Sequence, residues 1–283
     1  MSSRYTVIDV FTESPLTGNP LAVFTDARRI PERLLQPLAR EINYSETVFV
    51  LPAAEGGNAR IRIFTPAREV PFAGHPTLGA ALVLAAGVHL PELRLETGAG
   101  LVPVRIEREG VRPVAGWMDQ PIPSVALWPD AKPLLAALGV EGAELPIALY
   151  DNGIRHVLVA LRTEAQVAAL QPDLAALGRL GPIGVSCFAG AGLRWKTRMF
   201  GPGLGVNEDP ATGSAAGPLA LHLARHGRIA FGEQIELSQG EELQRPSRLW
   251  AQVDGTSEQP VRVAVGGGGV VVARGEFRIP GTS

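Results

Sequence analysis

The sequence predicts an α+β fold built from two pseudo-symmetric domains, each with a central buried helix. Short β-strand patterns dominate both halves of the chain, and one strongly apolar helix pattern interrupts each half. The segments that contain these helices share a layout: EVPFAGHPTLGAALVLAAG (69–87) and VNEDPATGSAAGPLALHLA (206–224). Each has an acidic residue, a titratable residue directly before proline, then threonine, glycine, small residues and the apolar helix. This layout predicts that His75 in the first half corresponds to Asp209 in the second.

The composition is that of a foldable, soluble protein. The chain has 283 residues, of which 46% are hydrophobic and 19% charged, and its net charge is -2. This small charge predicts no strong attraction to nucleic acid or to an anionic membrane. Lys132 and Lys196 are the only lysines, which weakens a Schiff-base mechanism. Cys187 is the single cysteine, so an intramolecular disulfide is impossible.

The N-terminal segment MSSRYTVIDVF begins with polar residues and continues as a strand. It lacks the basic and apolar regions of a secretory signal, and the chain contains no run of 18 apolar residues. We therefore expect a cytoplasmic protein.

The first half alternates strand patterns with two helix patterns. The helix expected at 31–42 places Leu34, Leu35, Leu38 and Ile42 on one stripe, and Pro37 is expected to kink or split it. The helix expected at 76–87 is apolar on all sides, with Pro76 suited to its first turn and Gly87 to its C-cap, which predicts a buried helix. The expected strands are 5–11, 21–24, 46–51, 59–64, 93–97 and 101–107.

The second half repeats this pattern. A helix is expected at 163–170, with Thr163 and Gln166 as a capping box, and an apolar helix at 212–227. Proline-rich segments between 119 and 133 predict the boundary between domains 1–122 and 123–269. The expected strands are 146–150, 156–162, 184–188, 194–200, 234–239, 248–254, 261–267 and 269–277.

The glycine-containing starts of the two apolar helices are candidate anion sites. A helix N-terminus offers free backbone N–H groups and the positive end of the helix dipole. Gly74, Gly213 and Ser214 permit close approach of a small carboxylate, and two such ends facing one cleft would hold a small carboxylic acid. These glycines could instead only cap helices, but the duplication of the pattern favours a site.

Three titratable residues are candidates for acid/base chemistry. Glu46 begins the apolar strand ETVFVL, and it shares a face with Val48 and Val50. A carboxylate there costs stability unless it is paired, protonated or functional, and an apolar setting suits a group that takes and returns a proton. The alternative is an edge strand that holds the carboxylate in water. His75 and Asp209 could alternatively be N-caps, although histidine is a poor cap.

Other conspicuous residues have simpler interpretations. His222 and His226 stand four apart on a helix, but no third metal ligand has suitable spacing, so we expect a solvated helix end and no metal site. His156 is expected to be a satisfied core histidine. The GGGG segment at 266–269 is expected to form a loop or bulge.

Seven motifs together resemble one known family. They span about residues 4 to 275 and are VIDVF…GNPLAVF, SETVFV, ARIRIFTP…EVPFAGHPTLGAA, NGIRHV, RMF, EDPATGSAAGPLA and QG…RPS. In this order they resemble the phenazine-biosynthesis PhzF family, which has the diaminopimelate-epimerase-like fold.

The resemblance implies a fold and an activity. Each domain would be a mixed β-sheet curled around its central helix, with the last strand, about 270–280, returning to the first domain. The protein would be a homodimer and a cofactor-independent isomerase, converting trans-2,3-dihydro-3-hydroxyanthranilic acid to its aminoketone tautomer in phenazine biosynthesis.

The resemblance also implies residue roles. Glu46 would move a proton from C3 to C1, assisted by His75 and Asp209, and Gly74, Gly213 and Ser214 would bind the substrate carboxylate. Related epimerases use two cysteines, which a chain with Cys187 alone cannot supply.

Two alternatives stay open. The first is an isomerase or tautomerase of the same fold that acts on another small carboxylic acid. The second is a small-acid binding protein without catalytic activity.

Overall fold

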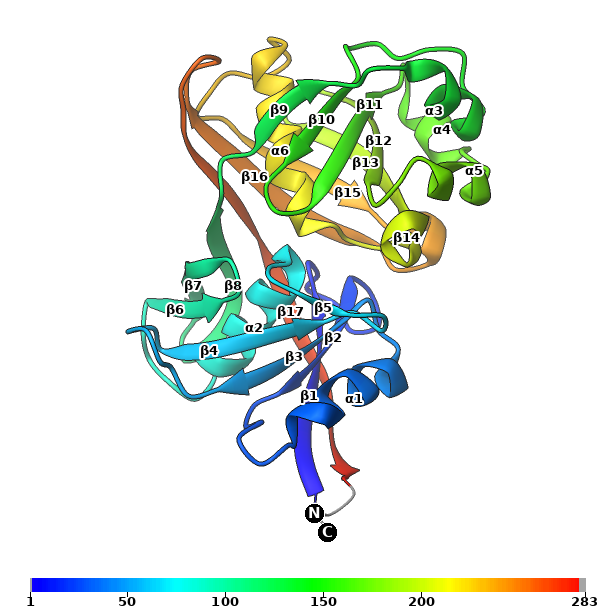
Figure 1. Cartoon of the computed structure of the whole chain (residues 1–283). Coiled ribbons are helices and arrows are strands. Elements are labelled where there is room, and N and C mark those ends of the chain that lie inside the picture. Colours follow the sequence, from blue (N-terminus) through cyan, green and yellow to red (C-terminus); the bar gives the residue numbers. More distant parts are fainter. Residues whose placement is uncertain (1, 280–283) are drawn as a thin grey trace. The chain divides into compact units, whose positions relative to one another are not determined.

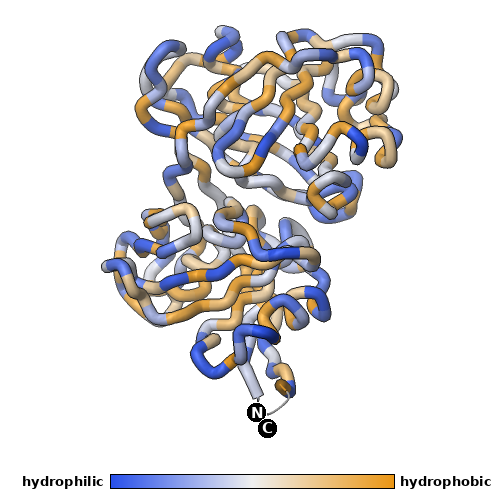
Figure 2. The backbone as a smooth tube through the Cα atoms, viewed as in Figure 1, coloured by the Kyte–Doolittle hydropathy of each residue, from blue (hydrophilic) through white to orange (hydrophobic). Residues whose placement is uncertain are grey.

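The predicted α+β class is confirmed in a computed structural model that describes residues 2–279. The chain forms two compact units: one contains the chain up to Asp119 and from Gly266 onward, and the other contains Gln120–Val265. Each unit places one helix against a curved mixed sheet, α2 (Gly74–Ala85) in the first unit and α6 (Gly213–Arg225) in the second (Figure 1). Hydrophobic residues follow the strands and central helices of each unit, and many connecting turns are hydrophilic (Figure 2).

The strands of the first unit close into a ring. Pairing runs from β17 through β1, β2, β3, β4, β6, β7 and β8 and returns to β17. The β2–β3 and β4–β6 pairs are parallel, whereas β1–β17, β1–β2 and β3–β4 are antiparallel. The strands are β1 (Ser2–Val10), β2 (Asn19–Phe24), β3 (Glu46–Leu51), β4 (Ala59–Phe64), β5 (Glu69–Val70), β6 (Glu92–Thr97), β7 (Gly100–Glu109), β8 (Arg112–Gln120) and β17 (Pro260–Arg278), the last shared with the second unit.

Helix α2 packs inside this ring against β1, β2, β3, β6 and β7. Gly79 allows the close approach, because a Cβ atom there would lie 2.6 Å from Leu21 Cδ2. The helix begins at Gly74, two residues before the predicted start, so Pro76 lies in its first turn but not at its first position.

The outer face of β3 and β4 is covered by α1 (Leu35–Ile42), which packs over Phe24, Phe49 and Phe64. A 3-10 turn, η1 (Glu32–Leu34), precedes it. The helix predicted at 31–42 is thus split between Leu34 and Leu35, and Pro37 lies in the first turn of α1.

The second unit has the same succession of parallel and antiparallel pairs. Its β11–β12 and β13–β15 pairs are parallel, and β12–β13 is antiparallel. Helix α6 packs against β11 and β16, and α3, α4 and α5 enclose a separate apolar cluster on the other side of β12 and β13. Its elements are β9 (Ser124–Leu127), α3 (Ala131–Leu138), β10 (Ala148–Asp151), β11 (Arg155–Ala160), α4 (Glu164–Ala168), α5 (Leu174–Arg179), β12 (Gly184–Ala191), β13 (Arg194–Gly201), η2 (Pro202–Leu204), β14 (Val206–Asp209), β15 (Gln234–Gln239), η3 (Glu241–Leu243) and β16 (Ser247–Gly255).

The prediction of a loop at 266–269 was wrong, because these glycines lie within β17. Their missing side chains make room for neighbours. A Cβ atom at Gly266 would lie 2.5 Å from the ring of Trp117, and one at Gly268 would lie 2.8 Å from the Thr12 carbonyl oxygen. Within residues 2–279, no helix combines the length and apolar character needed to cross a membrane.

The internal repeat is present, but its register differs from the one read in the sequence. Phe64 pairs with Glu69 in β4–β5, and Phe200 pairs with Glu208 in β13–β14. From each glutamate the chain reaches the first helical residue, Gly74 or Gly213, over the same number of residues.

The two helices therefore align residue by residue. His75 and Ser214 are both the second residue of their helix, and Val70 occupies the place of Asp209. The predicted match of His75 with Asp209 was wrong, because it aligned the following prolines and ignored strand pairing.

Both glutamates of the repeat are held by an arginine. Arg62 Nε and Nη2 contact the carboxylate of Glu69 at 2.7 and 2.6 Å, and Arg198 Nε and Nη2 contact that of Glu208 at 2.7 and 2.9 Å. Each guanidinium also lies over a phenylalanine ring two residues further along its strand, at 5.3 and 4.9 Å. Bidentate pairs of this kind fix geometry, so each clamp holds the strand that leads to a central helix.

Helix α6 contains a proline, and a side chain replaces the backbone hydrogen bond that this proline cannot make. Pro218 has no N–H to donate to the carbonyl of Ser214 one turn earlier. That carbonyl instead accepts a hydrogen bond of 2.9 Å from Asn152 Nδ2. Asn152 thereby satisfies a buried acceptor in the first turn of α6.

We predict that Asn152→Leu destabilises the protein by roughly 1–3 kcal/mol, because it leaves the Ser214 carbonyl without a donor. Pro218→Ala restores an N–H at the required place, so the double variant should lose less than Asn152→Leu alone. Urea unfolding followed by tryptophan fluorescence measures both values. If Asn152→Leu lowers the stability equally with proline and with alanine at position 218, Asn152 does not act through this carbonyl.

Candidate active site

In the first unit the structure brings Glu46 and His75 together. Glu46 is the first residue of β3, and its side chain is 16% exposed, whereas that of His75 is 4% exposed. Glu46 Oε2 lies 3.4 Å from His75 Nδ1. Strand β3 has a neighbour on each side, β2 and β4, so the edge-strand alternative for Glu46 does not hold.

His75 is an uncharged partner in this contact. Burial lowers its pKa to about 3, and a hydrogen bond with the backbone of Pro20 only partly opposes this effect. At neutral pH the imidazole is therefore neutral. It can position the glutamate or exchange a hydrogen bond with it, but it does not stabilise the carboxylate with a full charge.

The start of α2 offers donors beside this pair. Gly74 and His75 are its first two residues, both buried, and the N-cap residue Ala73 supplies no side-chain acceptor. First-turn N–H groups have no acceptor within a helix. The N-cap alternative for His75 is wrong, because His75 lies inside the helix.

In the second unit Asp209 ends β14 and is held by its neighbours. Its Oδ2 accepts a 2.6 Å hydrogen bond from Thr212 Oγ1, and its backbone carbonyl accepts a 2.7 Å bond from Gln239 Nε2. Gln239 Oε1 in turn accepts from the backbone N–H of Thr212 at 3.2 Å. Asp209 is not an N-cap, since that place belongs to Thr212, so this alternative was also wrong.

The start of α6 is a second group of unused donors. The N-cap Thr212 does not cap the helix with its side chain: its hydroxyl donates to Asp209, and its oxygen accepts from Gln239 Nε2 at 3.0 Å. The N–H groups of Ala215 and Ala216 donate to the Thr212 carbonyl. The N–H groups of Gly213 and Ser214 precede these, where helix geometry provides no acceptor and where an anion binds favourably.

Side chains that the sequence patterns did not single out as site residues hold this first turn in place. Gln120 Nε2 donates to the Gly213 carbonyl at 2.8 Å, Asn152 binds the Ser214 carbonyl, and His156 Nε2 lies 2.9 Å from Ser214 Oγ. Asn152 and His156 both lie in the NGIRHV motif, which was the sequence pattern that could have indicated their role. His156 is buried as predicted, but it is not fully satisfied: its Nδ1 has no hydrogen-bond partner among the described residues, and its Nε2 contacts a candidate site residue.

Two other candidates are buried within the second unit. Cys187 lies in β12, and burial raises the pKa of its thiol to about 12, so it does not supply a thiolate. The solvated helix end predicted for His222 was wrong: this residue is fully buried, with its Nδ1 3.1 Å from the hydroxyl of Tyr150 and its ring stacked edge-on against His226. Between residues 2 and 279, no cluster of three or more histidine, cysteine or acidic residues is arranged to hold a metal ion.

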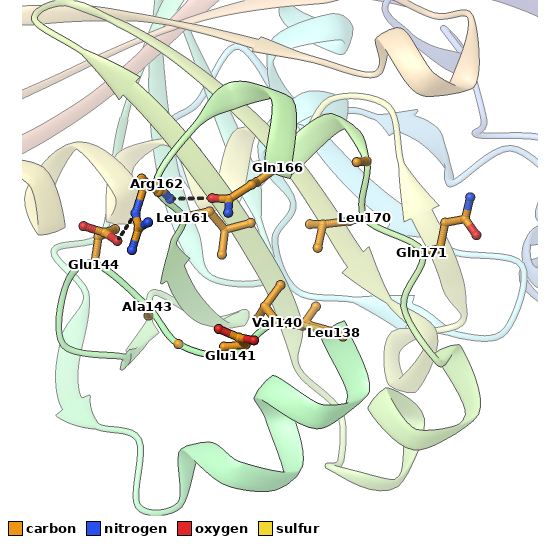
Figure 3. A pocket seen from close by; sticks show the side chains of 13 residues that line it. Leu138, Val140, Glu141, Ala143, Glu144, Leu161, Arg162, Gln166, Leu170 and Gln171 are labelled. Atoms are coloured by element: carbon orange, nitrogen blue, oxygen red, sulfur yellow. Dashed lines mark hydrogen bonds and ion pairs between the residues drawn. The ribbon is translucent and has the colours of Figure 1, made fainter.

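A separate hollow of about 740 Å³ in the second unit does not contain the candidate residues (Figure 3). It is lined by residues between Leu138 and Gln171. Two of its charged side chains contact each other, since Arg162 Nε lies 3.3 Å from Glu144 Oε1. The backbone N–H of Arg162 donates to Gln166 Oε1. The candidate residues lie outside this hollow, at the start of the central helix of each unit.

The sequence matches the family model PhzC-PhzF, described as phenazine biosynthesis-like protein, over residues 8–275. It is 51% identical to trans-2,3-dihydro-3-hydroxyanthranilate isomerase of Pseudomonas fluorescens, covering 96% of this chain and 98% of that protein. The protein of the same name from Pseudomonas aeruginosa is likewise 51% identical, with the same coverage.

Solved structures show the same fold. A predicted epimerase from Pseudomonas aeruginosa is 34% identical, with a TM-score of 0.84 over 98% of this chain and 100% of its own. A PhzF-family phenazine biosynthesis protein from Bacillus anthracis, 24% identical, has a TM-score of 0.87 over 99% and 100% of the two chains. A hydroxyproline epimerase from Agrobacterium vitis, 14% identical, has a TM-score of 0.66 over 98% and 91%. This last likeness concerns the fold alone and supports the diaminopimelate-epimerase-like class.

We predict that stability falls as the pH is lowered below about 6.5, the ordinary pKa of histidine. Burial lowers the pKa of His75 and His222 to about 3 and that of His156 to about 4. Their stabilising contribution is complete above 6.5 and is lost as the pH falls towards these folded-state values, because the unfolded chain binds protons that the folded chain does not. Each histidine contributes a slope of up to about 1.4 kcal/mol per pH unit.

Urea unfolding between pH 7 and 5.5, above the range where most carboxylates titrate, measures this slope. His156→Gln should reduce it by about one third, since one of three buried imidazoles is removed. A slope of zero in the wild type, or an unchanged slope in the variant, would contradict the prediction.

Proposed function

The chain belongs to the PhzC-PhzF family of phenazine biosynthesis-like proteins, and on this premise we propose that it is an isomerase of trans-2,3-dihydro-3-hydroxyanthranilate. The substrate is the one in the name of relatives that are 51% identical over nearly the whole chain. The observation that carries the proposal is the Glu46–His75 contact beside the free N–H groups of a helix start.

We propose that Glu46 moves one proton across one face of the substrate ring. Its carboxylate removes the proton from C3, the electron pair of that C–H bond moves through the ring double bonds, and a new C–H bond forms at C1 with the same proton. The resulting enol tautomerises to the aminoketone. Atoms and electrons balance within the substrate, so the reaction requires no oxidant, reductant or co-substrate.

The acid/base task explains why Glu46 needs its surroundings. The side chain must be charged before it takes the proton and neutral while it carries it, which a partly buried position allows at small cost in either state. Neutral His75 is suited to hold the carboxyl group in both states, since it carries no charge that would favour the ionised form. Asp209 is assigned an assisting role, with Thr212 fixing its carboxylate.

The substrate carboxylate is assigned to backbone donors. Gly74, Gly213 and Ser214 are buried first-turn residues of the two central helices, and glycine permits an anion to approach the main chain closely. The positive ends of the helix dipoles favour the bound carboxylate. Binding of the carboxylate thereby positions the ring for proton transfer.

Glu46→Gln is expected to lower turnover by at least about 10³-fold, because the amide cannot carry a proton, while binding of a carboxylate ligand changes little. Substrate loss is followed by ultraviolet absorbance, and binding by calorimetry with 3-hydroxyanthranilate. This aromatic analogue has no hydrogen on C3 to transfer.

The matched control is Glu41→Gln, which changes an exposed glutamate of α1 and should retain wild-type activity. Wild-type turnover by Glu46→Gln would refute the assigned role. Binding by the wild type without any turnover would instead point to another small carboxylic acid as substrate or to a binding protein. The homodimer and the cytoplasmic location stay predictions.

A further inference from the structure

In both units, a polar side chain from the sheet contacts the second residue of the central helix. In the first unit, Leu21 of β2 pairs with Glu46 of β3, and Glu46 contacts His75. In the second unit, His156 of β11 pairs with Gly184 of β12. The strand registers make Gly184 the counterpart of Glu46 and His156 the counterpart of Leu21, because Thr47 pairs with Phe64 as Val185 pairs with Phe200.

The second unit thus supplies its polar group from the neighbouring strand. Gly184 leaves space for the imidazole, since a Cβ atom there would lie 2.7 Å from His156 Nδ1. His156 Nε2 lies 2.9 Å from Ser214 Oγ, on the helix residue that corresponds to His75. Both side chains are buried, His156 completely.

The surroundings of the ring select one tautomer. His156 Nδ1 is buried and has no hydrogen-bond partner within the described chain. A proton on Nδ1 would be an unsatisfied buried donor packed against Gly184, whereas a bare nitrogen costs less. The proton therefore belongs on Nε2, which donates to Ser214 Oγ.

This donation determines what the serine hydroxyl can do. Its oxygen accepts from His156, and within residues 2–279 the hydroxyl makes no other hydrogen bond. Its own proton is therefore available to an incoming acceptor, next to the unused N–H groups of Gly213 and Ser214.

We propose that His156 is a positioning residue that holds the Ser214 hydroxyl as a hydrogen-bond donor to a bound carboxylate. The proposal rests on the proposed function for the identity of the ligand, but not on the proton transfer. Because burial lowers the pKa of His156 to about 4, this arrangement persists across the neutral pH range.

The test is a double-mutant cycle on the binding of 3-hydroxyanthranilate, measured by calorimetry at pH 7.5. His156→Leu should weaken binding about tenfold, the effect of one hydrogen bond to a charged group. His156→Gln, which can present an amide N–H near the place of Nε2, should stay within about threefold of the wild type. In a Ser214→Ala background, His156→Leu should have less than about a twofold further effect.

Nitrogen-15 NMR of histidine-labelled protein, assigned with His156→Gln, checks the tautomer without any ligand. A protonated Nε2 and an unprotonated Nδ1 are expected. A proton on Nδ1 would overturn the proposal, as would equal effects of His156→Leu with serine and with alanine at position 214.

The outcomes separate this inference from the proposed function. One outcome is that His156→Leu weakens binding only when residue 214 is serine, while the wild type does not turn over trans-2,3-dihydro-3-hydroxyanthranilate. This outcome would refute only the isomerase activity. If the wild type turns over the substrate but His156→Leu weakens binding equally with serine and with alanine at position 214, only the role of His156 would be refuted. Absence of wild-type binding would overturn the donor role of Ser214 and with it this inference.

Discussion

The free N–H groups at the buried start of each central helix, α2 and α6, are the constraint on which the proposed chemistry depends. A buried backbone donor without an acceptor costs free energy, and neither helix has a capping side chain. Both units therefore maintain an unfavourable feature that a bound anion would relieve. The surrounding hydrogen bonds do not cap these N–H groups. They fix the neighbouring strands and carbonyl groups: arginines bind Glu69 and Glu208, and the amides of Gln239 and Asn152 bind backbone carbonyls.

Duplication of the unit explains how one architecture carries two different tasks. The second helical residue is His75 in one unit and Ser214 in the other, and each contacts a polar side chain from the strands below. In the first unit this pair contains a carboxyl group able to carry a proton. In the second it contains a hydroxyl group able to donate a hydrogen bond. The division between acid/base chemistry and anion binding that we propose would follow from this difference between the two units.

Periodicity and helix-end patterns were sufficient to predict the fold class, the two central helices and the strand that begins with Glu46, because these depend on local sequence. The alignment of His75 with Asp209 failed, since equivalence depends on which residues pair across β4–β5 and β13–β14. The strand character of 266–269 was hidden because the glycines make room for distant side chains such as Trp117. Gln120, Asn152 and His156 contact α6 over long separations in sequence, so no local pattern reveals their partners.

The most direct test of the account follows the proton itself. Substrate deuterated at C3 is incubated with the enzyme in ordinary water, and deuterium NMR locates the label in the product. If Glu46 carries the proton from C3 to C1, part of the deuterium appears at C1, and Glu46→Gln yields no product. Product formation by Glu46→Gln at the wild-type rate, with no deuterium at C1 in either protein, would contradict the central claim.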